Sequence, residues 1–427
     1  MKNLKFPNPK RDRKRKRDRS GINGRRNSWV RSMAEPYLGT FIARLLRSGS
    51  IKFQFLYGTI LGGTAFNGVV EELKKLTTRV AHVLPVSDDG GSTAEIVRVL
   101  GGPAVGDIRS RCLRLSDQCT SEALAVRRLL GHRLPLDAEQ TKSEWCCYGQ
   151  GTKLWEESIL YGEVCQDPIT KPFELSLFIF RIRYALDHAV CVCRARIFFQ
   201  SLDAAIFLFS CISDIPAESL VLPVISTNDR LTLGCELQDG TIIRGQIEIS
   251  HPTTGSMQLI DKGSSSVLAL TSRIKRVFYM SSEGRNLLHE VFPTPNPSVL
   301  DQLSNVDCIV YAMGSLFTSI CPSLVLLGIG EIIGSRTCPK VLLLNGSHDR
   351  KTSGFTASCF VTATVVKDPL VIALTMEKDL ILLIIFILRP SQYINTLLMP
   401  KDGQVPVDVQ CLAAQGIFNV EICIFLH

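Results

Sequence analysis

Two adjacent aspartates, Asp88 and Asp89, end an apolar run and are followed at once by the glycine- and hydroxyl-rich residues 90–93. The end of a strand does not need paired like charges beside a flexible turn. A site for a cation, a phosphate or a polyhydroxy group does, because carboxylates bind hard cations and orient hydroxyl groups. We therefore interpret both aspartates as candidate catalytic and metal-binding residues. The alternative is that one carboxylate caps the following helix and the other is solvated.

A second candidate site is the turn GGTAFNG, residues 62–68, which follows an apolar run and opens a helix. Glycines let a phosphate approach the backbone, and the free N–H groups at the start of a helix point towards it. We interpret Gly62, Gly63, Thr64 and Asn67 as phosphate-binding candidates. The spacing matches neither G-x-G-x-x-G nor the Walker pattern, so a purely structural tight turn is the alternative.

A third turn contains Gly106, Asp107 and Arg109, with an acid and a guanidinium two residues apart. Arg109 can bind a phosphate with two parallel hydrogen bonds, and we include all three residues in the predicted binding set. A surface ion pair between Asp107 and Arg109 explains the same pattern equally well.

Two further apolar runs also end in small polar residues, Gly314 and Ser315 after one and Asn345 after the other. The carboxyl ends of parallel strands form the edge at which open α/β sheets bind ligands, so we add these residues to the predicted set. The histidines show no pairing that makes a metal site, and each is interpreted as a surface or partly buried residue.

The elements that must position these turns follow an alternating pattern. A strand, a glycine-rich turn, a helix over residues 69–76 and a second strand at 80–87 predict a βαβ unit and hence a parallel sheet. Short β-rich runs with an Asp239-Gly240 hairpin signal predict a β-rich insertion near residues 221–251. The predicted fold is α/β, a doubly wound and mainly parallel sheet with that small insertion. Further strands are expected at 273–280, 307–315 and 339–347, and helices at 297–306 and 323–334.

The charge is unevenly distributed along the chain of 427 residues. The net charge is +8, whereas residues 1–32 contain 13 Lys or Arg and two Asp, which is +11, so the rest carries about −3. We expect residues 1–50 to form a basic, disordered tail, and nucleic acid to be a partner only through that tail. The tail is interpreted as a solvated extension before a true start near Met33, a nuclear address or an organellar transit peptide. The expected location is intracellular, cytoplasmic or plastid, with the nucleus as the alternative.

Cysteine usage and hydropathy exclude two further classes. Fifteen cysteines occur without a C-x-x-C pair or a matching histidine spacing, so we expect reduced thiols and no zinc site. The strongest apolar run, residues 380–388, has nine residues and is too short to span a bilayer, so no membrane partner is expected.

These turns, in this order, resemble the CofD/YvcK group, which includes 2-phospho-L-lactate transferases and sugar-nucleotide-binding gluconeogenesis factors. The resemblance covers roughly residues 60–135, 195–362 and 393–418, the last in the manner of plant-type members. Its matching pieces are GGTAFNG (62–68), PVSDDGGSTAEI (85–96), GGPAVGDIRS (101–110), and the stretches at 221–246, 312–324 and 341–356.

The resemblance implies a Rossmann-like fold that binds a nucleotide-linked small molecule. Gly62, Gly63 and Thr64 would hold the nucleotide phosphate, and Asp88 and Asp89 would face the acceptor or a Mg²⁺ ion. The remaining predicted residues would complete the nucleotide pocket. In the transferase members an acceptor hydroxyl attacks a lactyl-phospho-guanosine donor and releases GMP. The alternative function is a non-catalytic, sugar-nucleotide-binding regulator, and a homodimer is left open.

Two segments depart from the family pattern, residues 146–194 and 363–392. Both are typical of retained intron or mis-joined exon sequence, and the first replaces a Ser/Gly-Asn loop that helps to wall the family's site. We expect residues 51–427 to form one CofD-like α/β domain that contains these two atypical segments.

Overall fold

A computed structural model describes residues 57–88, 90, 93, 97, 101–121, 123–124, 127, 131, 200–251, 269–281, 287–365 and 389–422. The basic tail, residues 1–50, and the atypical segment 146–194 lie outside the described residues. Of the second atypical segment, residues 363–365 end a helix and residues 389–392 begin the return to the sheet.

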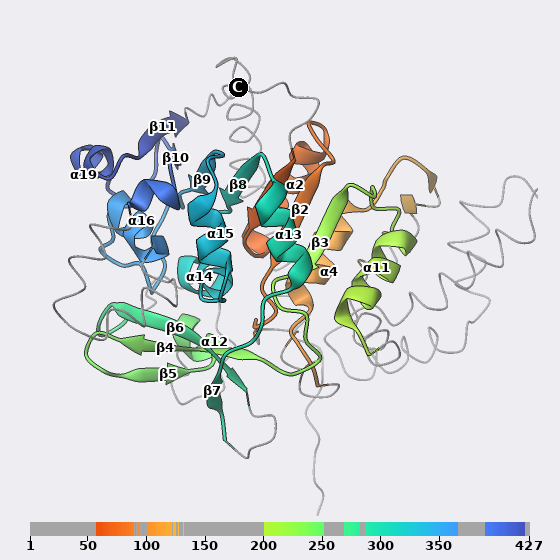
Figure 1. Cartoon of the computed structure of the whole chain (residues 1–427), viewed down its shortest axis with the longest axis horizontal. Coiled ribbons are helices and arrows are strands. Elements are labelled where there is room, and N and C mark those ends of the chain that lie inside the picture. The colour runs from red at the N-terminus through yellow and green to blue at the C-terminus, as the bar shows by residue number, and fades with distance from the viewer. Residues whose placement is uncertain are drawn as a thin grey trace, which may run out of the picture.

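The centre of the fold is a parallel sheet of seven strands (Figure 1). Every neighbouring pair in it is parallel, which confirms the doubly wound, Rossmann-like α/β prediction. The order across the sheet is β11-β10-β9-β8-β1-β2-β3. The strands are β1 (Gly58–Leu61), β2 (Val80–Leu84), β3 (Ser219–Pro223), β8 (Cys308–Tyr311), β9 (Lys340–Leu343), β10 (Thr396–Pro400) and β11 (Phe418–Ile422).

The chain reverses its direction of travel across the sheet at β1. From β1 it moves through β2 to β3, then returns to β8 and continues the other way to β11. Gly58 pairs with Val80 of β2 on one side and with Cys308 of β8 on the other. Such a switch point opens a crevice at the carboxyl ends of the two strands, which in open α/β sheets is the ligand site.

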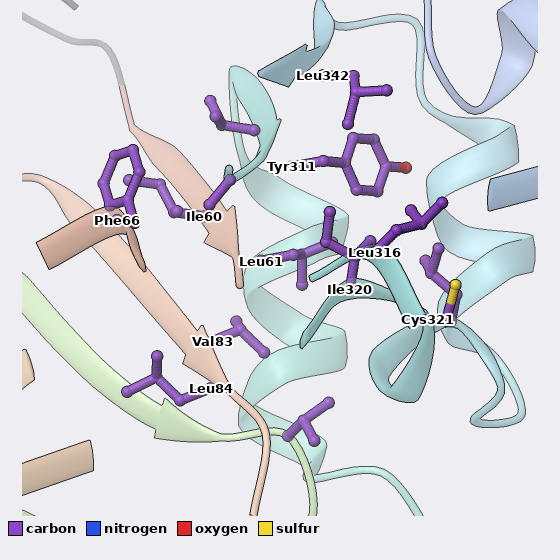
Figure 2. Packing of buried hydrophobic residues seen from close by; sticks show 14 of the residues in the cluster. Ile60, Leu61, Phe66, Val83, Leu84, Tyr311, Leu316, Ile320, Cys321 and Leu342 are labelled. Carbon is purple, nitrogen blue, oxygen red and sulfur yellow. The ribbon is translucent and has the colours of Figure 1, made fainter. Parts of the chain in front are cut away.

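The strands are buried on both faces, as a parallel sheet covered by helices requires. All five residues of β2, VAHVL, are buried, and so are all four of β8, CIVY. They belong to a continuous apolar core, part of which Figure 2 shows around Leu61, Leu316 and Ile320. This rigid centre fixes where the turns that follow β1, β2 and β8 begin.

Helices cover the sheet in two groups, which right-handed crossovers place on opposite faces. In one group α4 packs against α2 and α11, and in the other α15 packs against α13 and α14 (Figure 1). The predicted helix at 297–306 is confirmed as α13, with Asn296 as its N-cap and Pro297 in its first turn. The main helices are α2 (Asn67–Lys74), α4 (Gly106–Leu115), α11 (Leu202–Ile212), α13 (Pro297–Asn305), α15 (Ile329–Ser335), α16 (Ala357–Val365) and α19 (Val409–Ala414).

The prediction of one helix over residues 323–334 is wrong. The segment instead contains the end of α14 (Cys321–Leu324), a break, and α15. Gly328 has a φ of 88°, a left-handed conformation that ends regular α-helical hydrogen bonding and that glycine adopts without steric cost. Before α14, a short π-helical turn, η4 (Leu316–Ile320), leads the chain out of β8.

The β-rich insertion is a separate antiparallel sheet with the order β5-β4-β6-β7. The predicted hairpin at Asp239-Gly240 joins β4 to β5, and Gly240 has a φ of 86°. The predicted bounds, 221–251, need correction, because residues 221–223 belong to β3 and the sheet continues through β6 to β7. The strands are β4 (Thr232–Leu237), β5 (Ile242–Arg244), β6 (Ile274–Ser281) and β7 (His289–Val291).

In the described part of the chain, no single helix is long and apolar enough to cross a membrane. The segments Leu316–Leu324 and Ile329–Ser335, which meet at a bend of 84°, are together long and apolar enough, by length and composition alone.

Candidate functional site

The turn after β1 packs tightly against the turn after β8. The Gly62 N–H donates to the Val83 carbonyl, so the sheet already uses this donor. A Cβ atom at Gly62 would lie 2.6 Å from the Cβ of Ala312, which makes any larger residue incompatible with the packing here. Gly62 therefore allows the two strand ends to approach closely, and its N–H is not free to bind phosphate as the sequence suggested.

Gly63 lies where two polar side chains from different elements meet. A Cβ atom at Gly63 would lie 3.0 Å from Oδ2 of Asp107 and 3.1 Å from Oγ of Ser319. Asp107 is in the first turn of α4, and Ser319 is in η4 after β8. Thr64, the exposed residue that follows Gly63, faces the Asp107 carboxylate with its backbone N–H and its hydroxyl. The turn after β1 thus contacts the Asp107 carboxylate. Sequence reasoning had placed Asp107 in a separate turn of the predicted site.

The Asp107 carboxyl is buried, with 8% of the residue exposed. Its pKa is raised to about 7, first by burial and then by the charge of nearby Asp88, although Arg111 and Thr64 oppose the rise. Asp88 is half-buried in the turn that follows β2, and its Oδ1 accepts a hydrogen bond of 3.1 Å from the Gly90 N–H. Two carboxylates from separate elements are therefore close enough to influence each other's protonation. Asp89, the other predicted acid, lies outside the described residues.

Beneath this turn, Arg111 is fully enclosed and hydrogen-bonded on three sides. Its Nε donates to Asn67 Oδ1 at 2.6 Å, one terminal nitrogen donates to His82 Nδ1 at 2.8 Å, and the other donates to the Gly63 carbonyl at 2.8 Å. The guanidinium also lies over the Phe66 ring, 5.4 Å from its centroid. Burial lowers the pKa of Arg111 only to about 10, so it stays charged at neutral pH. Arg111 thereby fixes the peptide that presents Gly63 to the crevice.

His82 is fully buried in β2, which corrects its interpretation as a surface or partly buried residue. Burial and the adjacent Arg111 charge hold the pKa of His82 well below its usual value, so the ring is neutral. Because Nδ1 accepts from Arg111, the proton is on Nε2. His82 is therefore a structural acceptor for the arginine.

Two predicted phosphate-binding residues, Asn67 in α2 and Arg109 in α4, are placed differently from what the sequence suggested. Both polar atoms of the Asn67 amide are hydrogen-bonded within the protein: its Oδ1 accepts from Arg111, and its Nδ2 donates to Ser110 Oγ at 2.7 Å. Arg109 follows Asp107 by two residues, about 200° around the helix, so the two side chains leave different faces. Arg111, four residues after Asp107, is the cation on the same face of α4, and its charge acts on the Asp107 carboxyl.

The turn after β8 is held by the turn after β9. Asn345 Oδ1 accepts from the Gly314 N–H at 2.9 Å, and its Nδ2 donates to the Gly314 carbonyl at 2.6 Å. Gly314 has a φ of 137° and approaches the Cβ of Ala65. Of the predicted residues, Gly63, Asp107 and Gly314 are thus brought to one place, with Asn345 supporting them.

Ser315 connects the crevice to a charged pair that sequence reasoning missed. Its hydroxyl donates to Asp349 Oδ2 at 3.1 Å, and the Lys351 ammonium lies 3.1 Å from the same oxygen. Burial acts to raise the pKa of Asp349, but the Lys351 charge and the hydrogen bonds from Thr352 and Ser315 hold it below its usual value. Lys351 also donates to Ser250 Oγ at 3.3 Å, which ties this loop to the helix beside the antiparallel sheet.

The remaining predicted residue, Gly106, begins α4 where there is no room for a side chain. A Cβ atom there would lie 2.3 Å from Thr93 Oγ1. Within the described ranges, no group of three or more His, Cys, Asp or Glu side chains is placed to hold a metal ion. A small pocket of about 50 Å³ continues the carboxyl edge of the sheet past Asn345, and it is lined by Leu344, Asn345, Met399, Pro400, Lys401, Gly403, Val405 and Val407.

Simple helix spacing could have found two of the missed residues. Arg111 follows Asp107 by four positions, which places both on one face of α4. Ser319 follows Ser315 by four positions, and the Ser319 N–H donates to the Ser315 carbonyl. Asp349 and Lys351 had no such signal, because their contacts join segments that are far apart in the sequence.

Comparison with known proteins gives one family and two groups of relatives. The family model described as "2-phospho-L-lactate transferase CofD" matches residues 59–367. An uncharacterised protein of Saccharomyces cerevisiae is 31% identical, and the match covers 69% of this chain and 78% of the yeast protein. The gluconeogenesis factor of Bacillus subtilis is 26% identical, with 71% of each chain covered, and that of Halalkalibacterium halodurans is 25% identical, with 70% and 69% covered.

Solved structures share the fold. A crystal structure of a Bacillus halodurans protein described as a member of the UPF0052 family superposes with a TM-score of 0.57 at 21% identity, covering 87% of this chain and 94% of that one. A second crystal structure of a protein from Bacillus halodurans gives a TM-score of 0.56 at 21% identity, with 87% and 93% covered. At this identity the likeness supports the fold alone.

Proposed function

Because this chain belongs to the CofD family, we propose that the crevice between β1 and β8 binds a nucleotide-linked phosphate ligand and transfers a phospho group from it, as a 2-phospho-L-lactate transferase does. The observation that supports this proposal most directly is the position of Asp107. Its Oδ2 lies against Gly63 at the topological switch point, and its pKa is raised to about 7 by burial and by Asp88. A carboxylate with such a pKa suits proton transfer near neutral pH.

In the proposed reaction, an acceptor hydroxyl oxygen forms a bond to the lactyl-bearing phosphorus of a lactyl-diphospho-guanosine donor. The bond from that phosphorus to the GMP phosphate oxygen breaks, and GMP leaves with the electron pair. The hydroxyl proton goes to Asp107, the candidate general base. Arg111, beneath the turn, keeps Gly63 and Thr64 in position, because its guanidinium holds the Gly63 carbonyl. Catalysis of this kind depends mainly on positioning and on charge neutralisation.

The donor set fits the Mg²⁺ ion that the family resemblance implies. Magnesium is typically held by one or two carboxylates, with waters and substrate phosphate oxygens completing its shell. Asp88 provides one such carboxylate, and Asp89 stays the predicted second one. When bound, the ion would offset the negative charge of the phosphates beside the two acids.

A sugar-nucleotide-binding regulator is the second candidate function. It is favoured by the curated relatives in Bacillus subtilis and Halalkalibacterium halodurans, both named gluconeogenesis factor. Such a protein would use the same crevice without transfer. The two candidates differ in ligand and in turnover, so one set of measurements separates them.

The test is calorimetric titration of the purified protein in Mg²⁺ with GDP and with UDP-glucose, followed by an assay for GMP release. The assay contains guanosine-diphospho-lactate as donor and a deazaflavin as acceptor. GDP binding together with acceptor-dependent GMP release supports the transferase. UDP-glucose binding without GMP release supports the regulator. If none of these ligands binds, both proposals are wrong.

The variant Asp88→Asn is expected to lower the rate of GMP release by about a hundredfold or more, because it removes a charge that positions the cation and the acceptor. Its thermal midpoint should stay close to that of the wild-type protein, since Asp88 is only half-buried, in the turn that follows β2. Asp301→Asn, at an exposed aspartate of α13, is the matched control and should keep full activity. Unchanged turnover in Asp88→Asn would remove this carboxylate from the mechanism.

A further inference from the structure

The short π-helical turn η4 brings one polar side chain to the crevice. Leu316, Phe317, Thr318 and Ile320 of this turn are buried, whereas Ser319 is half-buried. A π-helical turn is wider than an α-helical one, and such turns occur frequently at functional sites. Here the turn starts directly after Ser315 and ends in α14, so both of its ends are fixed by packed elements.

The Ser319 hydroxyl lies between the two glycine turns that flank the switch point. A Cβ atom at Gly63, after β1, would lie 3.1 Å from Ser319 Oγ, and one at Gly314, after β8, would lie 3.9 Å from it. Oδ2 of Asp107 lies on the same side of Gly63, 3.0 Å from the same hypothetical atom. The hydroxyl and the candidate general base thus both lie against the position that a side chain at Gly63 would occupy.

Most of the polar groups around Ser319 are hydrogen-bonded to other groups of the protein. Ser315 donates to Asp349, and Asn345 bonds both the N–H and the carbonyl of Gly314. In contrast, the Ser319 side chain makes no hydrogen bond to any residue that the structure describes. Its hydroxyl is therefore available to a molecule in the crevice.

We propose that Ser319 is a further ligand-binding residue, which donates its hydroxyl to a phosphoryl oxygen of the bound molecule. This inference rests on the proposed function, which puts a phosphate ligand in the crevice. A phosphoryl oxygen placed beside Asp107 and Asp88 meets two acids on one side and needs a donor on the other. The Ser319 hydroxyl supplies that donor from the β8 side, and the glycines let the phosphate come within reach of it.

The test compares the wild-type protein with Ser319→Ala by calorimetric titration in Mg²⁺, with GDP and with inorganic pyrophosphate as probes. Loss of one hydrogen bond to a charged oxygen is expected to weaken the affinity for both probes by about ten- to a hundredfold. The thermal midpoint should not move, because the hydroxyl is not used within the described fold. Ser304→Ala, at a half-buried serine of α13 whose hydroxyl bonds the Leu300 carbonyl, is the matched control.

The outcomes separate this proposal from the function on which it rests. Equal pyrophosphate affinity in the wild-type protein and in Ser319→Ala overturns the role of Ser319 and leaves the proposed function standing. A wild-type protein that binds neither probe nor UDP-glucose overturns both. Ser319→Cys is the second variant, for use if the alanine variant is unstable, because a thiol is of similar size but is a weak hydrogen-bond donor. An affinity equal to that of the wild-type protein in Ser319→Cys would also overturn the proposal.

Discussion

The variant Asp107→Asn is expected to be more stable than the wild-type protein at pH 8, by on the order of 2–4 kcal/mol. The native fold buries this carboxyl and raises its pKa to about 7, whereas an exposed aspartate in the unfolded chain titrates near 4. Above pH 7 the native protein therefore holds a buried charge beside Asp88. An asparagine removes that charge and still offers a carbonyl oxygen to Thr64. The rate of GMP release is expected to fall, because this variant lacks the candidate general base.

The stabilisation by Asp107→Asn is expected to depend on pH. Between about pH 4 and pH 7 the unfolded chain has released the Asp107 proton and the native protein retains it, so the native state loses stability as the pH rises through this window. Urea denaturation at pH 4.5 and at pH 8, in the presence of a chelator, should show a gain for Asp107→Asn only at the higher pH. Asp349→Asn should do the opposite and destabilise at pH 8, because the pKa of Asp349 is lowered. A loss of stability at pH 8 in Asp107→Asn would contradict the prediction.

The variant Arg111→Leu is expected to lose at least about 3 kcal/mol of stability. It leaves three buried acceptors without their donor, namely Asn67 Oδ1, His82 Nδ1 and the Gly63 carbonyl. Each buried acceptor left unsatisfied costs about 1–3 kcal/mol. Because domains are typically stable by only about 5–15 kcal/mol, a loss of this size moves the urea midpoint far to lower concentration. Denaturation curves followed by circular dichroism measure it.

Arg114, three residues later on α4, is the matched control for Arg111. It pairs with Glu71 at 3.2 Å, and both side chains are about one-third exposed. Arg114→Leu should cost no more than about 1 kcal/mol, as partly exposed pairs usually do. If both arginine variants were equally stable, the buried network would not be a main support of the turn after β1.

The positions of the candidate site were predictable from the sequence, because they depend on local patterns. Apolar runs followed by glycine mark where parallel strands end, and the alternation of strands and helices brings those ends to one edge. On that basis the sequence puts Gly63 and Gly314 at one edge of the sheet, and the structure brings Ser319 close to both positions. The sheet order, the antiparallel insertion as a separate sheet, and the break at Gly328 needed the three-dimensional structure, since they depend on pairing between distant segments.

The use of each polar group was not predictable in the same way. Asn67 and Asn345 have the right chemistry for a phosphate, yet both amides bond neighbouring groups of the protein. A surface pair of Asp107 with Arg109 was one of two alternatives that the sequence left open, whereas helix geometry places Arg111 on the same face as Asp107. Whether a donor is free or committed depends on contacts between elements that are far apart in sequence, and no local pattern contains that information.

The pairing of β1 with β8 affects how the protein can be made. The Tyr57 N–H next to β1 donates to Asp307 next to β8, across 250 residues of chain. At ordinary translation rates of about 5–20 residues per second, a ribosome needs roughly 10–50 s to deliver the second strand after the first. Throughout that interval one hydrogen-bonding edge of β1 has no native partner. The switch point between β1 and β8 therefore cannot form on a nascent chain until its later half has emerged, and until then this edge of β1 is open to non-native pairing.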